Sequence, residues 1–254
     1  MTIESAETIR CPDYDDPTKI TDENAEEYLC EYCGMRGRAC DGKGNIKIDC
    51  LWSRGRMKVL IACEFSGIVR DAFAKRGHDA WSCDLLPTEA PGNHYQGDII
   101  DIVTDNWDLM IAHPPCTYLC VPGAHYLHNR FERWNKLGKA VGFFMRLYET
   151  PISKICIENP VPNRYAKLPK YSQIIHPWQF GHELSKRTCL WLKNLPKVEP
   201  TQIMQNRGER YTRTIRQQVK YGKSSNSKWY AKATIQERSR TFQGIANATA
   251  EQWG

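Results

Sequence analysis

A short apolar run that ends in two prolines and a cysteine is the stretch of this sequence best suited to chemistry. The run is Leu109 to Ala112, and His113, Pro114, Pro115 and Cys116 follow it. An apolar run bounded by such breakers is typical of a buried parallel strand. Proline cannot extend a strand ladder, so we expect Cys116 on a loop at the carboxyl end of the strand, where open α/β sheets bind ligands. Cys116 is therefore a candidate nucleophile. The alternative, that it is small apolar filler like many of the eleven cysteines, stays open here.

A second apolar run has the same plan. Ser153 to Ile157 is predicted to be a strand, and Glu158, Asn159 and Pro160 follow it. If the two strands end at the same edge of one sheet, a thiol and a carboxyl group would share a pocket.

The segment before these runs predicts a strand, a turn and a helix. Lys58 to Cys63 is apolar at its centre, Glu64 to Gly67 suits a turn, and Ile68 to Arg76 has apolar residues at helical spacing before Gly77. A strand from His78 to Asp84 then ends in an acid roughly 20 residues after the glycine turn, where a carboxylate can bind ribose hydroxyls. The alternative is an ordinary corner closed by a surface carboxylate.

Later segments supply helices that could cover a sheet. Apolar residues recur at three- and four-residue intervals from Phe131 to Tyr148 and again from Phe242 to Trp253, and Cys189 to Leu192 is predicted to be a strand. Strands alternating with helices predict an α/β protein with a mostly parallel sheet.

The amino-terminal part is acidic and then rich in cysteine. Residues 1–29 carry nine Asp and Glu, and Cys30, Cys33, Cys40 and Cys50 follow among glycines. Cys-x2-Cys lets two thiolates converge on one tetrahedral ion, so these four are candidate zinc ligands, with Cys11 as a substitute. The alternative is a set of reduced, unliganded thiols.

Composition excludes several classes of protein. Hydrophobic residues make up 41% of the chain and charged residues 25%, and no apolar run approaches the roughly 18 residues of a membrane span. We see no secretory signal in Met1 to Arg10, so we expect a cytoplasmic, reducing location and no membrane partner. Residues 193–240 hold twelve Lys and Arg against three Glu, which suits a phosphate backbone, although a solvated basic face is the alternative.

Taken in order, the motifs resemble those of the DNA cytosine-C5 methyltransferase family, in particular its compact phage and prophage members. The resemblance covers about Lys58 to Trp253. It is carried by the following segments: Phe65-Ser66-Gly67, Asp84, Gly97 to Ile99, Pro114-Pro115-Cys116, Glu158-Asn159-Pro160, Gly181 to Leu192, and Gly244 to Ala248. It departs from the family where Leu184 and Thr188 replace a Gln and an Arg, where Val69 replaces a glycine, and where His113 precedes the prolines.

The resemblance implies a Rossmann-like, S-adenosylmethionine-dependent methyltransferase fold that acts on a cytosine flipped out of double-stranded DNA. It implies that Cys116 attacks C6 and Glu158 binds the ring, with Lys186 or Arg187 supporting the base and its phosphate. It places the cofactor beside Phe65, Ser66, Gly67, Asp84, Asp98, Pro114 and Asn247.

The sequence thus predicts four parts: an acidic and Cys-rich appendage (1–56), a catalytic domain (57–192), a short basic target-recognition region (193–238) and a returning carboxyl-terminal helix (239–254). We expect a monomer in a bacterial or phage-infected cell, serving restriction-modification or DNA protection. Alternatives are a catalytically idle DNA-binding protein on the same fold, and a C5 transferase with another acceptor, such as RNA, or another transferred group, such as carboxymethyl.

Overall fold

The computed structural model describes residues 56–128, 130–205 and 235–254. The chain divides after Arg56, and the unit Met57–Gly254 carries the described elements. The candidate zinc ligands and residues 206–234 of the basic stretch lie outside the described residues, so the predictions made for them stay predictions.

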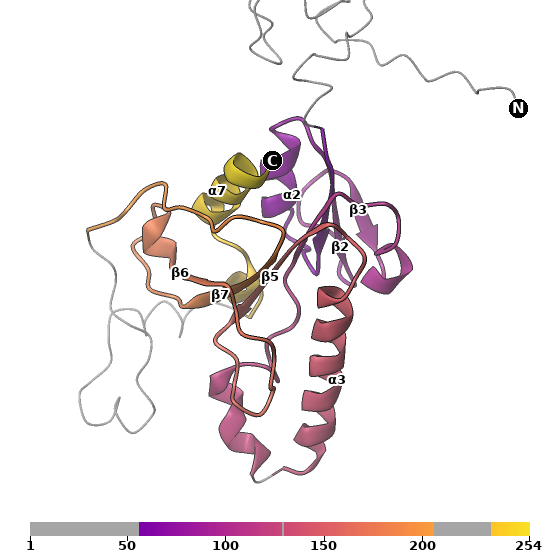
Figure 1. Ribbon diagram of the computed structural model, residues 1–254, viewed down its shortest axis with the longest axis vertical. Helices are drawn as coiled ribbons and strands as arrows, with labels where there is room; N and C mark the ends of the chain where they lie inside the picture. The colour runs from indigo at the N-terminus through magenta and orange to yellow at the C-terminus, as the bar shows by residue number, and fades with distance from the viewer. Residues whose placement is uncertain (1–55, 129, 206–234) are drawn as a thin grey trace, which may run out of the picture. The chain divides into compact units, whose positions relative to one another are not determined.

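Seven strands in the described part of the chain form one sheet, in the order β3-β2-β1-β4-β5-β7-β6 (Figure 1). Their bounds are β1 Lys58–Ala62, β2 Asp79–Asp84, β3 His94–Gln96, β4 Leu109–Ala112, β5 Lys154–Pro160, β6 Gln173–Ile175 and β7 Thr188–Lys193. Strands β1 to β5 are parallel, and β7 runs antiparallel to both of its neighbours. The predicted α/β, Rossmann-like fold is confirmed. In such a sheet the strand order reverses between β1 and β4, and ligands bind outside the carboxyl ends of the strands there.

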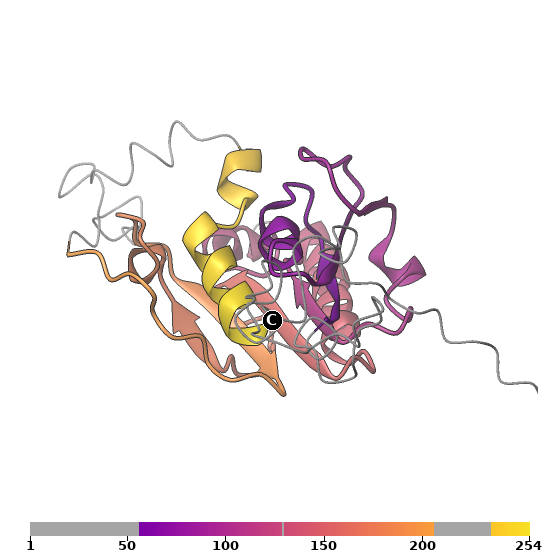
Figure 2. The ribbon, with the colours of Figure 1, turned by 90° about the horizontal axis from the view of Figure 1, so that it is seen from above.

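Helices cover both faces of the sheet because its central strands are apolar on both sides. The helices are α2 Ile68–Ala74, α3 Glu132–Tyr148, α6 Ile235–Ser239 and α7 Gln243–Trp253, with 3₁₀ helices η2 Ile99–Asp101, η3 Val121–Leu127 and η4 Pro177–Gln179. Leu60, Met110 and Ile155 pack with the buried residues of α3. Val59, Ile61 and Ile111 pack on the other face with α2 and α7, which lie side by side (Figure 2).

The structure differs from the sequence-based expectation in three strands. β3 and β6 have three residues each, and runs that short carry no readable alternation. The predicted strand from Ser153 to Ile157 continues as β5 to Pro160, because Glu158, Asn159 and Pro160 pair with β7 after the pairing with β4 has ended at Ile157. The prediction that Glu158 follows its strand is therefore wrong: Glu158 lies within it.

Gly244 lets α7 dock against the loop that precedes β7. A side chain there would collide with the carbonyl oxygen of Phe180. The N–H of Gly244 donates to the Nε2 of His182 at 3.0 Å. α7 packs against the sheet, with Ile245, Ala246 and Trp253 buried.

Candidate active site

The corner between β1 and α2 is held by a buried carboxylate. Glu64, 5% exposed, accepts hydrogen bonds from the N–H of Val69 at 2.8 Å, the N–H of Arg70 at 3.2 Å and the hydroxyl of Ser66 at 3.1 Å. The chain's own negative charge thus satisfies the first N–H groups of α2, a position where Rossmann folds often bind the phosphate of a cofactor. Sequence reasoning missed this role, since Glu64 reads as an ordinary turn residue.

Arg70 fixes the loop that follows β2. Its guanidinium, 1% exposed, donates to the hydroxyls of Ser82 and Thr88 and to the carbonyls of Ala90 and Pro91. Gly67, with φ of 75°, leaves room for it, because a Cβ there would lie 2.5 Å from the Arg70 Nη2. The loop that begins at the end of β2 is therefore anchored to α2.

Two predicted cofactor-binding acids lie near the end of β1. Asp84 ends β2 and accepts from the N–H of Leu86 at 2.9 Å, and Asp98 caps η2 through the N–H of Ile100 at 3.0 Å. Burial, followed by the charges of Asp84 and Asp98, raises the pKa of the Cys63 thiol well above its ordinary value. The charges of both carboxylates therefore reach the residue that follows β1.

The register of β4 and β5 brings Glu158 next to His113. Ala112 pairs with Ile157, so His113 and Glu158 are the next residues across the two strands. The Nδ1 of His113 lies 2.9 Å from the Oε2 of Glu158. One residue further, the Nδ2 of Asn159, which is 1% exposed, donates to the carbonyl of Pro114 at 2.8 Å.

Asn163 holds the chain on the other side of Cys116. Its Nδ2 donates to the carbonyls of Tyr118 at 3.0 Å and Leu119 at 2.9 Å. The loop beginning at Cys116 is itself a turn, since the N–H groups of Leu119 and Cys120 both donate to the Cys116 carbonyl at 3.0 Å. Asn159 and Asn163 therefore fix the loop to the β5 segment before and after the candidate nucleophile.

The environment of Cys116 favours a thiolate. A hydrogen bond from the Cys120 thiol, outweighing burial and the charge of Glu158 and assisted by Lys186, lowers the pKa of Cys116 to about 7. Burial has the opposite result at Cys83 and Cys189, whose pKa values rise to about 12 and about 11. A thiol that is ionised near neutral pH is a competent nucleophile.

Glu158 is an ionised carboxylate in the free protein. Burial acts to raise its pKa, but the hydrogen bond with His113 and the charges of Lys186 and His113 together lower the pKa of Glu158 below its ordinary value. The carboxylate and the thiol of Cys116 influence one another's ionisation, so they belong to one electrostatic site.

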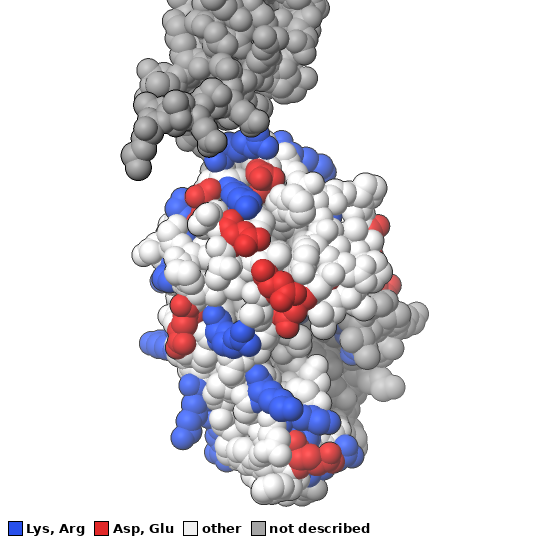
Figure 3. All heavy atoms as spheres, turned by 90° about the vertical axis from the view of Figure 1, so that its right-hand side faces the viewer, with Lys and Arg blue, Asp and Glu red and all other residues white. Residues whose placement is uncertain are grey.

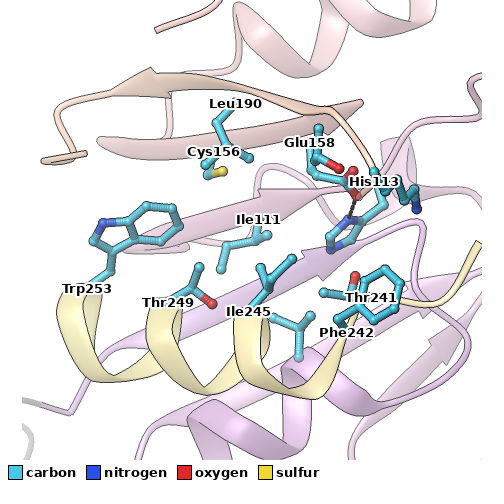
Figure 4. Close-up of a pocket in the computed structure, with 13 residues that line it drawn as sticks. Ile111, His113, Cys156, Glu158, Leu190, Thr241, Phe242, Ile245, Thr249 and Trp253 are labelled. Carbon is cyan, nitrogen blue, oxygen red and sulfur yellow. Dashed lines mark hydrogen bonds and ion pairs between the residues drawn. The ribbon is translucent and has the colours of Figure 1, made fainter. Parts of the chain in front are cut away.

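Two cavities meet at His113. The first, which we call the α7 cavity, lies between the sheet and α7 (Figure 4). Ile111, Leu190 and Trp253 make much of it apolar, and His113, Glu158 and Lys186 supply its polar groups. The second, the corner cavity, is bounded by Glu64, Phe65 and Ser66 from the β1 corner, by Ser239, Arg240 and Thr241, and by Cys63 and His113.

Of the predicted site residues, Glu158 and Lys186 line the α7 cavity and Phe65 and Ser66 line the corner cavity, whereas Cys116 lines neither of the two. Lys186 reaches the α7 cavity and donates to the carbonyl of Arg238 at 3.3 Å. Arg187 is exposed, and Asn247 lies on the exposed face of α7, where its Oδ1 accepts from Gln243. Between α6 and α7, Arg240 lines the corner cavity, Phe242 lines the α7 cavity and Thr241 lines both. No pattern in the sequence marks these three as site residues.

The surface of the described residues is of mixed charge. Figure 3 shows Lys and Arg interspersed with Asp and Glu, with basic side chains over the lower part, where α3 lies. Lys136, Lys139 and Arg146 are exposed on that helix. None of the helices in the described ranges is long and apolar enough to cross a membrane, and these ranges hold no group of three or more His, Cys, Asp or Glu arranged for a metal ion.

The described unit is thus an α/β protein with a Rossmann-like sheet. No protein-family model matches the sequence, and no curated protein matches it. Parts of it are similar to solved structures. A prophage-encoded protein of E. coli assigned as a DNA modification methyltransferase shares 15% identity over 58% of this chain and 52% of that chain, with a TM-score of 0.35.

Two further solved structures are similar at the same level. The Dnmt2 methyltransferase of S. pombe shares 18% identity over 56% of this chain and 51% of its own, with a TM-score of 0.36. The Entamoeba histolytica methyltransferase EhMeth shares 13% identity over 63% of this chain and 62% of its own, with a TM-score of 0.38. The alignments thus span between half and about three fifths of the matched chains. Activity and substrate have to be argued from this chain's own residues.

Proposed function

We propose that this protein is an S-adenosylmethionine-dependent DNA cytosine-C5 methyltransferase. The observation that carries the proposal is the pairing of β4 with β5, beyond which a thiol of lowered pKa and a half-buried carboxylate follow at the carboxyl edge of a Rossmann-like sheet. C5 of cytosine is a poor nucleophile in an aromatic ring, and a thiol beside an acid is the equipment that activates it.

In this reaction the Cys116 thiolate adds to C6 of the base. The C6–S bond forms, the C5=C6 electron pair becomes available at C5, and charge develops on the ring nitrogen N3. Glu158 would supply a proton to N3 of the base. His113 binds the Oε2 of Glu158, and the other oxygen, Oε1, would accept a hydrogen bond from the exocyclic amine. At the end a solvent water takes the C5 proton, the C5–H electron pair restores the C5=C6 bond and expels the Cys116 thiolate, and N3 returns its proton to Glu158.

The residues of the corner cavity fit the proposed cofactor. Phe65 offers an apolar contact within it. Asp84 at the end of β2 and Asp98 at the start of η2 do not line this cavity, but their charges act on Cys63, which does, and they offer carboxylates for the ribose and the adenine. Because Glu64 already satisfies the start of α2, the site suits a cofactor without phosphate better than a dinucleotide. When bound, S-adenosylmethionine supplies the sulfonium methyl group that C5 takes.

Double-stranded DNA is the proposed acceptor because extruding a base costs a few kcal/mol, which cationic contacts to phosphate would offset. Lys186 lines the α7 cavity, and in this proposal it would support the flipped base. The basic stretch, the zinc knuckle and a cytoplasmic monomeric state remain part of this proposal.

The test is to incubate the protein and S-adenosylmethionine with unmodified bacterial genomic DNA and to analyse the nucleosides by mass spectrometry. We expect 5-methylcytosine from the wild type and none from Cys116→Ala, whereas Cys189→Ala, a buried thiol on β7, serves as the matched control and should retain activity. Product from Cys116→Ala would refute the covalent mechanism.

A trapping experiment separates an enzyme from an idle DNA-binding protein. DNA that carries 5-fluorocytosine should form an adduct at Cys116, because fluorine at C5 cannot leave as a proton does. DNA binding without an adduct or a modified nucleoside would favour the idle binder.

A further inference from the structure

His113 forms a pair with Glu158 that the register of two strands fixes. The residues lie opposite each other just beyond the last paired positions of β4 and β5, and the His113 N–H also donates to the carbonyl of Ala62 at 2.9 Å. Their side chains are 12% and 18% exposed, and Nδ1 and Oε2 are 2.9 Å apart. The backbone on both sides therefore holds the imidazole against the carboxylate.

The other ring nitrogen of His113 is not used by the fold. Nε2 is buried and has no hydrogen-bond partner among the described residues. Figure 4 shows the imidazole between Glu158 on one side and Thr241 and Ile245 on the other. Because an ionised Glu158 can only accept, the proton on the nitrogen facing it must be on Nδ1. The imidazole is thus oriented as a donor to the carboxylate.

We propose that His113 is a positioning residue that sets the acid strength of Glu158, an inference that rests on the proposed function. When Glu158 gives its proton to N3 of the base, the O–H bond breaks, the N3–H bond forms, and the electron pair stays on the carboxylate. The Nδ1–H of His113 stabilises that carboxylate and so makes Glu158 the stronger acid. Since Glu158 is ionised in the free protein, it takes up a proton from solvent before or during base binding.

Other charged and titratable groups lie around His113 and Glu158, and they contribute to the dependence of the methylation rate on pH. Lys186, preceding β7, stabilises the carboxylate by its charge. Burial, and then the charge of Glu158, raises the pKa of the Cys156 thiol, two residues earlier on β5. The charge of Glu158 also raises the pKa of the Cys116 and Cys189 thiols, and Arg187 lowers that of Cys189. Cys63, Glu64 and Arg240 share the corner cavity with His113.

The direct test is to titrate Glu158 by carbon NMR in protein labelled at the glutamate carboxyl carbons, with Glu158→Gln to assign the signal. In His113→Ala the pKa of Glu158 should rise, because burial still penalises the carboxylate and its donor is gone. His113→Asn keeps a neutral N–H donor near the position of Nδ1, so the rise should be smaller. An unchanged pKa of Glu158 in His113→Ala would overturn the inference.

His78→Asn is the matched control. His78 is also a buried histidine that uses Nδ1, accepting from the N–H of Met57 at 3.2 Å, but it lies at the amino end of β1, away from the site. It should leave the pKa of Glu158 unchanged. If His113→Ala does not fold, as judged by thermal unfolding, His113→Asn and His113→Gln decide in its place.

The pH profile of methylation of unmodified genomic DNA gives the second readout. Removing the donor should lower the rate at low pH by roughly tenfold and move the decline at high pH to higher pH, because Glu158 becomes a weaker acid that stays protonated longer. A purely structural role of His113 would lower the rate without moving that decline, and would contradict the inference. Absence of methylation by the wild type would refute the proposed function, whereas the NMR titration decides the coupling of His113 and Glu158 by itself.

Discussion

Asn159 offers a measure of how firmly the loop of the candidate nucleophile is held. Replacing it with alanine removes the donor that lies 2.8 Å from the Pro114 carbonyl, at a position 1% exposed. A buried acceptor that loses its donor costs about 1–3 kcal/mol. The Oδ1 of Asn159 is itself buried without a partner among the described residues, and its removal returns part of that cost. We therefore expect Asn159→Ala to lower the free energy of unfolding by about 1–2 kcal/mol.

Urea unfolding followed by circular dichroism measures this change, and hydrogen exchange locates it. Exchange at the N–H groups of Leu119 and Cys120, which bond to the Cys116 carbonyl, should become faster in the variant. Gln173→Ala is the matched control, because Gln173 makes amide hydrogen bonds to Val198 away from this loop and its loss should leave that exchange unchanged. A stability within about 0.3 kcal/mol of the wild type, well under the expected cost, together with unchanged exchange would refute the reasoning.

Three further predictions concern the thiol, the docking of α7 and the pH dependence of stability. Alkylation by iodoacetamide should label Cys116 with a midpoint near pH 7, and Cys120→Ala should move that midpoint toward the ordinary value of 9.0; an unmoved midpoint would contradict the assigned hydrogen bond. Gly244→Ala should destabilise the protein by about 1–3 kcal/mol, because the new side chain collides with the Phe180 carbonyl, and an unchanged melting temperature would speak against this packing. Burial lowers the pKa of His182, so the stability that the neutral imidazole contributes is present above about pH 6.5 and is lost as the pH falls through the folded-state pKa. His182→Gln should therefore flatten the dependence of the unfolding free energy on pH below about 6.5. An equal slope in the variant and the wild type would exclude this role of His182.

Much of the sheet can be predicted from the sequence. β1 and β4 are continuous apolar runs because a central parallel strand is buried on both faces, and that pattern is readable without neighbours. Periodicity predicts α3, around Leu137 and Phe144, and the carboxyl-terminal helix α7. Each of these helices buries one face, so its apolar residues recur at helical spacing. β3 and β6 form because each pairs with a longer neighbouring strand, β2 and β7 respectively. The local sequence of a three-residue strand does not indicate such a partner.

The sequence by itself determined that Cys116 stands just after a buried strand, because apolar runs and prolines act locally. Only the tertiary structure decided what faces it. Ala112 pairs with Ile157 where β4 and β5 end their ladder. Beyond that pair, three side-chain hydrogen bonds join residues that are 45 positions apart: His113 with Glu158, Pro114 with Asn159, and Tyr118 with Asn163. One parallel register therefore sets the partner of the imidazole and the two amides that hold the loop. Register depends on how two whole strands pack with the rest of the sheet, so it cannot be read from either strand alone.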